Sequence, residues 1–189
     1  MKLLCFRIAV LCCCIAFSAC AAPPDPIETK AVFDKGVVAY DAKDYEEAFR
    51  IFSSIDDSDL AAMRNVALML RRGQGTAKDP KAAEDMYARA ANGGLATAAA
   101  DLGEMLLKGE AGPPDPKAAL PWLLGAARAG HPFAALEAGQ ILEEGAAYPK
   151  DIESARALYR QAADAGLEDA KKRLAALPLE PAVTATPKQ

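Results

Sequence analysis

Cysteine is missing from the chain beyond position 20. The sequence of 189 residues has five cysteines, and these are Cys5, Cys12, Cys13, Cys14 and Cys20. Removal of an N-terminal export signal would leave at most the last of them, which excludes a disulfide framework and a cysteine-based metal site. The stability of the folded part must therefore come from packing alone.

Histidine is almost as scarce, because His131 is the only one. A metal site needs several convergent ligands, so we expect His131 to have a structural role. Ser53, Ser54 and Ser58 have no histidine near them in the sequence, and the pattern of a nucleophile elbow is absent. The glycine-containing loops lack the Lys-Ser/Thr pair of a phosphate-binding loop. We therefore expect no enzymatic activity, no cofactor and no metal.

Positive charge is also in short supply. Without Lys2 and Arg7, which lie in the first 20 residues, the chain has 20 basic and 26 acidic residues and a net charge of −6. A nucleic-acid-binding protein needs clustered Lys and Arg to neutralise phosphates. We therefore expect no nucleic-acid partner.

The chain does contain a repeat with a period of 36 residues. Glycine recurs at this step in two series, which are Gly73, Gly109 and Gly145, and Gly94, Gly130 and Gly166. Aspartate recurs at the same step, at Asp79, Asp115 and Asp151. Self-similarity at a step of about 20 to 50 residues indicates a stacked array of repeated units.

Each unit has the pattern of two antiparallel helices. Gly109 is expected to end the first helix, since glycine adopts the left-handed conformation at a helix end without a Cβ clash. Asp115 is expected to cap the second helix, with Pro116 at its first position, where a missing N–H costs nothing. Small residues at helical spacing allow the two helices to approach closely. Leu106 and Trp122 are expected to fill the space between hairpins.

The motif A-x-x-x-L-G-x-x-L-x-x-G, followed by D-P-x-x-A and a late A-A-x-x-G, resembles the Sel1-like repeat, a relative of the tetratricopeptide repeat. The resemblance extends from about Asp59 to Leu177. It implies an all-α fold, an α-solenoid of antiparallel helix hairpins. Arrays of this kind bury a continuous core and present an extended concave surface.

The organisation of the chain follows from the repeat and from composition. We predict a signal peptide with a lipobox at 1–20, a Pro-rich tether at 21–29, a repeat array at 30–177 and a disordered tail at 178–189. The array would comprise hairpins at about 30–56, 59–94, 95–130 and 131–166 and a capping helix at 167–177. The first hairpin has a shorter turn than the others, as is common for terminal repeats.

The N-terminal segment has the layout of a secretory signal peptide, because basic residues precede an apolar run at 8–17 that is too short to span a bilayer comfortably. Residues 17–20, with the sequence F-S-A-C, resemble the bacterial lipobox, in which the cysteine, here Cys20, is lipidated. Ordinary cleavage near residues 19–22 is the alternative. The resemblance implies a periplasm-facing lipoprotein of the bacterial cell envelope, and Ala21 after the cysteine implies the outer membrane.

By resemblance to the tetratricopeptide groove, the first helix of each hairpin lines the concave surface, where an unknown protein or peptide partner would bind. The residues predicted to face this partner are Arg64, Leu68, Arg71, Arg72, Glu104, Leu107, Lys108, Leu136, Gln140, Glu143 and Glu144. The alternative is that their charges form an ordinary solvated helix face.

The charges in this set change sign along the array, from Arg71 and Arg72 to Glu143 and Glu144. A bound segment would then place its acidic end near Arg72 and its basic end near Glu143. Reversing the charges of Arg71 and Arg72 together is expected to slow binding and to leave the melting temperature nearly unchanged.

The leading interpretation is a non-enzymatic adaptor of the cell envelope, held by a lipid anchor and binding another protein through its concave face. Two alternatives stay open. The first is a structural envelope protein that contacts the cell wall, and the second is a hydrolase with an unrecognised site.

Overall fold

The computed structural model describes residues 26–55, 58–145 and 147–178. This part of the chain consists of helices and connecting turns, with no strand. The helices are α1 (Pro26–Asp41), α2 (Tyr45–Ser53), α3 (Leu60–Arg72), α4 (Pro80–Asn92), α5 (Ala96–Lys108), α6 (Pro116–Arg128), α7 (Pro132–Glu144), α8 (Ile152–Asp164) and α9 (Glu168–Ala176). Each helix packs on the next along the chain, which confirms the predicted all-α solenoid. The predicted signal peptide with its lipobox lies outside the described residues, as does the predicted tail beyond position 178.

The repeated glycines and aspartates end and begin helices as predicted. Gly73, Gly109 and Gly145 are C-caps in the left-handed region, with φ of 69°, 66° and 72°. The side chains of Asp79, Asp115 and Asp151 accept hydrogen bonds from backbone N–H groups in the first turns of α4, α6 and α8. One set of cap chemistry therefore sets the helix boundaries in all three units.

Helix α1 begins earlier than the sequence predicted. It starts at Pro26, inside the segment 21–29 that we expected to be an extended tether. Proline is well suited to the first turn of a helix, since its fixed φ is helical and its missing N–H has no partner to lose there. The prolines of this segment therefore do not keep all of it extended.

The two helices of a hairpin approach closely where a glycine of the first helix faces a large side chain of the second. A Cβ on Gly103 would lie 2.5 Å from the side chain of Leu123, and one on Gly139 would lie 2.6 Å from Tyr159. Leu123 and Tyr159 are fully buried. Trp122, one position earlier than Leu123, is only partly buried and packs where two core clusters meet. Trp122 therefore lies between hairpins, as predicted, and Leu123 fills the interior of its own hairpin, for which the sequence predicted no particular residue.

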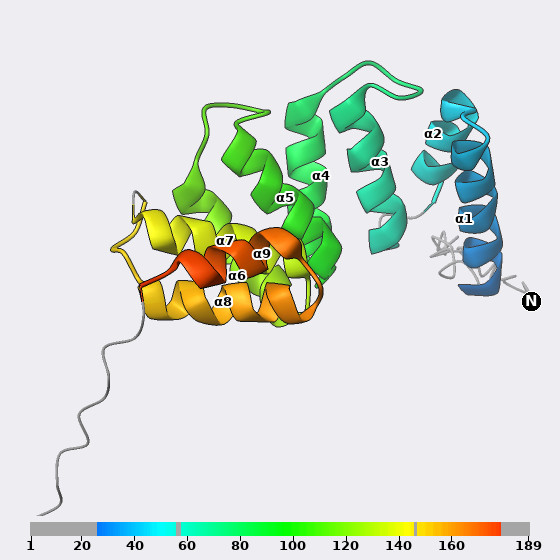
Figure 1. Ribbon diagram of the computed structural model, residues 1–189. Helices are drawn as coiled ribbons and strands as arrows, with labels where there is room; N and C mark the ends of the chain where they lie inside the picture. Colours follow the sequence, from blue (N-terminus) through cyan, green and yellow to red (C-terminus); the bar gives the residue numbers. More distant parts are fainter. Residues whose placement is uncertain (1–25, 56–57, 146, 179–189) are drawn as a thin grey trace, which may run out of the picture.

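The hairpins follow one another from α1 to α9, and α8 and α9 run across the direction of α1 and α3 (Figure 1). Helix α5 packs directly on α7 as well as on α4 and α6, and side chains of α3 reach α5. We call the surface formed by α3, α5 and α7 the inner face. No helix of the described part is long and apolar enough to cross a membrane.

Candidate functional site

Two arginines of α3 form ion pairs with carboxylates of the next repeat. The Nε atom of Arg64 lies 2.6 Å from Oδ2 of Asp101. Arg71 donates to both carboxylate oxygens of Glu110, at 2.7 and 2.5 Å, and to Glu104 at 3.0 Å. The Arg71 side chain is only 12% exposed, so its charge is satisfied within the protein.

These contacts shift the acidities of the groups involved. Hydrogen bonds from Arg71 hold the pKa of Glu110 below its ordinary value. Burial acts to raise the pKa of Glu104, but hydrogen bonds from Lys108 and Arg71 outweigh it, and the pKa is lowered. The hydrogen bonds to Glu110 raise the pKa of Arg71. All of these groups are therefore charged near neutral pH and form one ion-pair network between repeats.

The other predicted basic residues also have partners on the protein. Arg72 donates from Nη1 to the Tyr40 hydroxyl at 3.1 Å. Lys108 pairs with Glu104, one turn earlier on the same helix. Among the predicted acidic residues, Glu144 is exposed.

Glu143 is held between the last hairpin and the capping helix α9. Its Oε2 atom accepts a hydrogen bond of 2.6 Å from the Tyr159 hydroxyl and one of 3.1 Å from Nη1 of Arg173. The Glu143 carboxylate thus accepts hydrogen bonds from a buried tyrosine hydroxyl and from a guanidinium. Its charge is engaged in a structural contact and is not free.

The uncharged members of the predicted set are half-buried. Leu68, Leu107 and Leu136 pack against the core clusters of their repeats, and Gln140 is half-buried on α7. Each of these side chains therefore presents only part of its surface to solvent.

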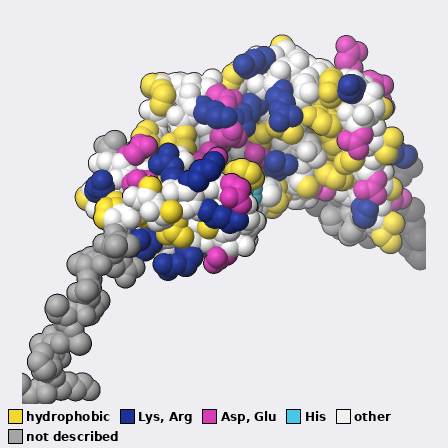
Figure 2. All heavy atoms as spheres, viewed as in Figure 1, with side chains coloured by type: hydrophobic (Ala, Val, Ile, Leu, Met, Phe, Trp, Pro, Cys, Tyr) yellow, Lys and Arg dark blue, Asp and Glu magenta, His cyan; other side chains and the backbone are white. Residues whose placement is uncertain are grey.

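The predicted gradient of free charges along the inner face is therefore corrected by the structure. Arg71 at one end and Glu143 at the other are both engaged in internal contacts. The orientation predicted for a bound segment loses its basis, because these charges are already paired. Basic and acidic side chains are interspersed over the face shown in Figure 2, as expected where charges pair with their neighbours.

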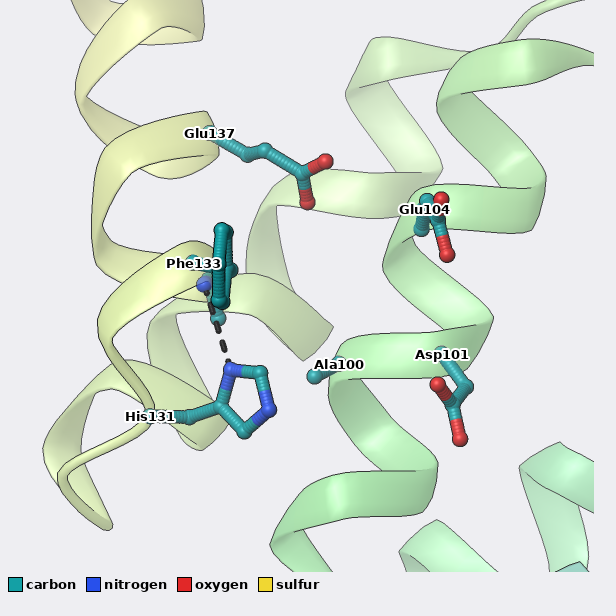
Figure 3. Close-up of a pocket in the computed structure, with 7 residues that line it drawn as sticks. Ala100, Asp101, Glu104, His131, Phe133 and Glu137 are labelled. Carbon is teal, nitrogen blue, oxygen red and sulfur yellow. Dashed lines mark hydrogen bonds between the residues drawn. The ribbon is translucent and has the colours of Figure 1, made fainter. Parts of the chain in front are cut away.

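An open pocket of about 230 Å³ lies between α5 and α7 on the inner face. It is lined by Ala100, Asp101, Glu104, His131, Phe133, Ala134 and Glu137. Figure 3 shows Glu137 extending from α7 toward α5, the helix that carries Ala100, Asp101 and Glu104. Phe133 is 61% exposed and is among the few large apolar side chains of the described part that are exposed to this extent.

His131 has the structural role that the sequence predicted. Its Nδ1 atom accepts a hydrogen bond of 3.3 Å from the backbone N–H of Ala134, and it caps helix α7. In the described part of the chain, no group of three or more His, Cys, Asp or Glu residues is arranged to hold a metal ion.

Of the three carboxylates that line this pocket, Glu137 alone forms no ion pair or hydrogen bond with another described residue. Burial raises its pKa to about 7, and the negative charge of Glu104 adds to the shift, while Lys108 and Arg71 oppose it. Asp101 and Glu104, by contrast, are paired with arginines of α3. Glu137 is therefore a partly buried acid that the fold leaves unpaired.

The sequence reasoning did not select Asp101, Phe133 or Glu137. The 36-residue step could have indicated Glu137, because comparing the same position in successive repeats shows where an ion-pair partner is missing. The partial burial of Glu137 could not be predicted from the sequence, since it depends on how closely α5 and α7 pack.

The raised pKa of Glu137 predicts a pH-dependent effect of Glu137→Gln. Between about pH 4.5 and 7 the folded state binds more protons at this site than the unfolded chain, so the contribution of Glu137 to stability falls as pH rises. The glutamine side chain of the variant cannot ionise. We expect the variant to gain on the order of 1–2 kcal/mol over the wild type between pH 4.5 and pH 8, after a discount for partial solvation.

Urea titrations at several pH values measure this difference. Glu144→Gln, at an exposed position of the same helix, is the matched control, and its difference from the wild type should change little with pH. A Glu137→Gln difference that is constant across the range would show that Glu137 is well solvated.

The fold defines the class of protein, which is an α-solenoid built from repeated antiparallel helix hairpins. The chain belongs to the Sel1 repeat family, whose repeat matches residues 60–95, 96–131 and 132–167. Sel1 repeats generally serve as scaffolds for protein–protein interaction. No curated protein matches the chain.

Solved structures with the same fold come from several bacteria. A Sel1 repeat protein from Oxalobacter formigenes is 28% identical, with a TM-score of 0.70, over 76% of this chain and 57% of that one. A protective antigen of uropathogenic Escherichia coli that displays this repeat fold is 21% identical, with a TM-score of 0.69, over 77% of this chain and 32% of that one. An immunity protein from Pseudomonas aeruginosa is 26% identical, with a TM-score of 0.53, over 81% of this chain and 59% of that one.

The chain thus matches less than two thirds of the length of each of these proteins. The similarity concerns the repeat array, and the likeness to the Escherichia coli antigen concerns the fold alone.

Proposed function

We propose that this protein is a non-enzymatic adaptor of the bacterial cell envelope that binds a partner protein through its inner face. The observation that carries the proposal is the pocket between α5 and α7, with the exposed ring of Phe133 beside the unpaired carboxylate of Glu137. Aromatic side chains are enriched at the centre of protein interfaces, where they bury a large apolar area against the partner. The family supports the same function, since its repeats are generally interaction scaffolds.

Site-specific photo-crosslinking in cells tests this proposal. The replacement Phe133→p-benzoylphenylalanine puts the crosslinking group on the inner face, and the same replacement of Asp85 puts it on α4, where the native side chain is 71% exposed. We expect a discrete adduct with an envelope protein from position 133 and none from position 85. Identical adducts from both positions, or none from either, would contradict the proposal. An adduct with peptidoglycan would support a structural contact with the cell wall instead.

We further propose that Cys20 is lipidated and holds the array on the periplasmic side of the outer membrane. Support comes from the lipobox-like sequence that ends at Cys20, which lies outside the described residues. Cys20→Ser should release the protein as a soluble or unprocessed form, because the lipid attachment point is lost. Mass spectrometry of the mature N-terminus decides the question. An unmodified terminus at Ala22 or Pro23 would show ordinary secretion.

A further inference from the structure

The repeat allows the α3–α5 and α5–α7 contacts to be compared position by position. In the first, Arg64 of α3 pairs with Asp101 of α5 at 2.6 Å. A step of 36 residues takes this pair to Ala100 and Glu137. The acid is thus present in the second contact, but an alanine stands where the arginine would be.

The pocket lies at the place of this missing arginine. Ala100 and Glu137 both line it, and its volume of about 230 Å³ is several times the roughly 30 Å³ that a water molecule takes up in the liquid. The short side chain of Ala100 leaves space that a long side chain fills in the preceding contact. A guanidinium that entered this space would meet the unpaired carboxylate of Glu137.

The second arginine contact is missing at the same step. Arg71 pairs with Glu104 across α3 and α5, and the equivalent residues across α5 and α7 are Leu107 and Gln140. No ion pair joins α5 to α7 within the described residues. The contact between these two helices therefore contains an acid, Glu137, to which the described part of the chain supplies no paired cation, and it can accept a positive charge from outside.

Phe133 adds a feature that the other repeats lack. Its equivalents in the two preceding units are Thr97 and Ala61, both too small to cover a bound side chain. An aromatic ring at the rim of an acidic pocket favours a planar guanidinium, which stacks on the ring while its N–H groups reach the carboxylate. An ammonium group gains less from this arrangement, because it is compact and strongly hydrated.

We propose that the pocket between α5 and α7 receives an arginine side chain of the partner protein, which pairs with Glu137 and stacks on Phe133. This inference rests on the proposed adaptor function and identifies the chemistry of the partner. The charged groups around the site favour a cation, because Asp101 and Glu104 lie beside Glu137. The basic residues that pair with these acids, which include Arg71 on α3 and Lys108 on α5, reduce this attraction without removing it.

Binding of three labelled peptides to the full-length mature protein tests the proposal. The peptide Ala-Leu-Arg-Leu-Ala, with blocked ends, is compared with versions that carry citrulline or lysine in place of arginine, by fluorescence anisotropy. We expect saturable binding of the arginine peptide and binding at least about tenfold weaker for citrulline, which has the same shape without the charge. The lysine peptide should lie between them.

Two variants locate the binding site. Glu137→Gln keeps the shape of the pocket and should weaken the arginine peptide by about tenfold. Ala100→Arg should supply the missing arginine from the protein itself, so we expect it to abolish binding of the peptide and to raise the melting temperature. Asp85→Asn, on α4, where the native side chain is 71% exposed, should leave binding unchanged.

Several results would overturn the inference. These are equal affinity for arginine and citrulline, wild-type affinity in Glu137→Gln, or no saturable binding at peptide concentrations up to about 1 mM. The crosslink from position 133 distinguishes this failure from that of the adaptor function. If that adduct forms equally well in the Glu137→Gln background, a partner binds the inner face without an arginine in this pocket.

Discussion

Leu123→Ala is expected to lower the free energy of unfolding by about 3–5 kcal/mol, the upper part of the range for a buried leucine. Leu123 is fully buried in the central hairpin and contacts the backbone of α5 at Gly103. Because the residue opposite is a glycine, it has no side chain of its own that could fill the cavity. A denaturant titration followed by circular dichroism measures the effect.

A double-mutant cycle with Gly103→Ala tests the packing directly. Alone, Gly103→Ala should destabilise by about 1–3 kcal/mol, because its Cβ would lie 2.5 Å from Leu123. In the Leu123→Ala background the same methyl group enters the cavity, and the substitution should be neutral or stabilising. Equal effects in the two backgrounds would show that the two residues do not meet.

Helix boundaries could be predicted because they depend on residues within one turn of each boundary. Gly109 and Asp115 end and begin helices through their own backbone and side-chain geometry, and the repeat shows the same solution three times. Trp122 was assigned to the space between hairpins, and it does lie where two core clusters meet. The sequence could not show that Leu123 fills the hairpin interior, because both residues lie within the same apolar stripe.

The state of the inner-face charges could not be predicted in the same way. Arg71 and Glu104 are 33 residues apart, and Arg71 and Glu110 are 39 residues apart. Whether these side chains meet depends on the distance and stagger between α3 and α5. A pattern of charge along single helices predicts which residues face outward, but it does not show which of them pair across repeats. For the same reason, Glu137 can be recognised as unpaired only when the α3–α5 contact is compared with the α5–α7 contact in the structure.

Arg71→Glu is expected to lower the free energy of unfolding by about 2–4 kcal/mol, somewhat less than the loss of a fully buried pair because its partners are partly exposed. The change removes the bidentate contact with Glu110 and the contact with Glu104. It also places a third carboxylate between them at a side-chain position that is 12% exposed. This differs from the sequence-based expectation that reversing Arg71 and Arg72 would leave the melting temperature nearly unchanged.

The pH dependence of this loss separates ion pairing from packing. In the wild type the lowered pKa values of Glu104 and Glu110 give stability that is present above about pH 4.5 and is lost as pH falls. The gap between wild type and Arg71→Glu should therefore narrow below pH 4.5, where the carboxylates become protonated. Arg72→Glu, whose native side chain lies at an exposed contact with Tyr40, is the control and should cost less than about 1 kcal/mol. If both reversals lowered the free energy of unfolding equally, the Arg71 side chain would be unpaired and exposed to solvent in the native protein. Its charge would then be available to a partner.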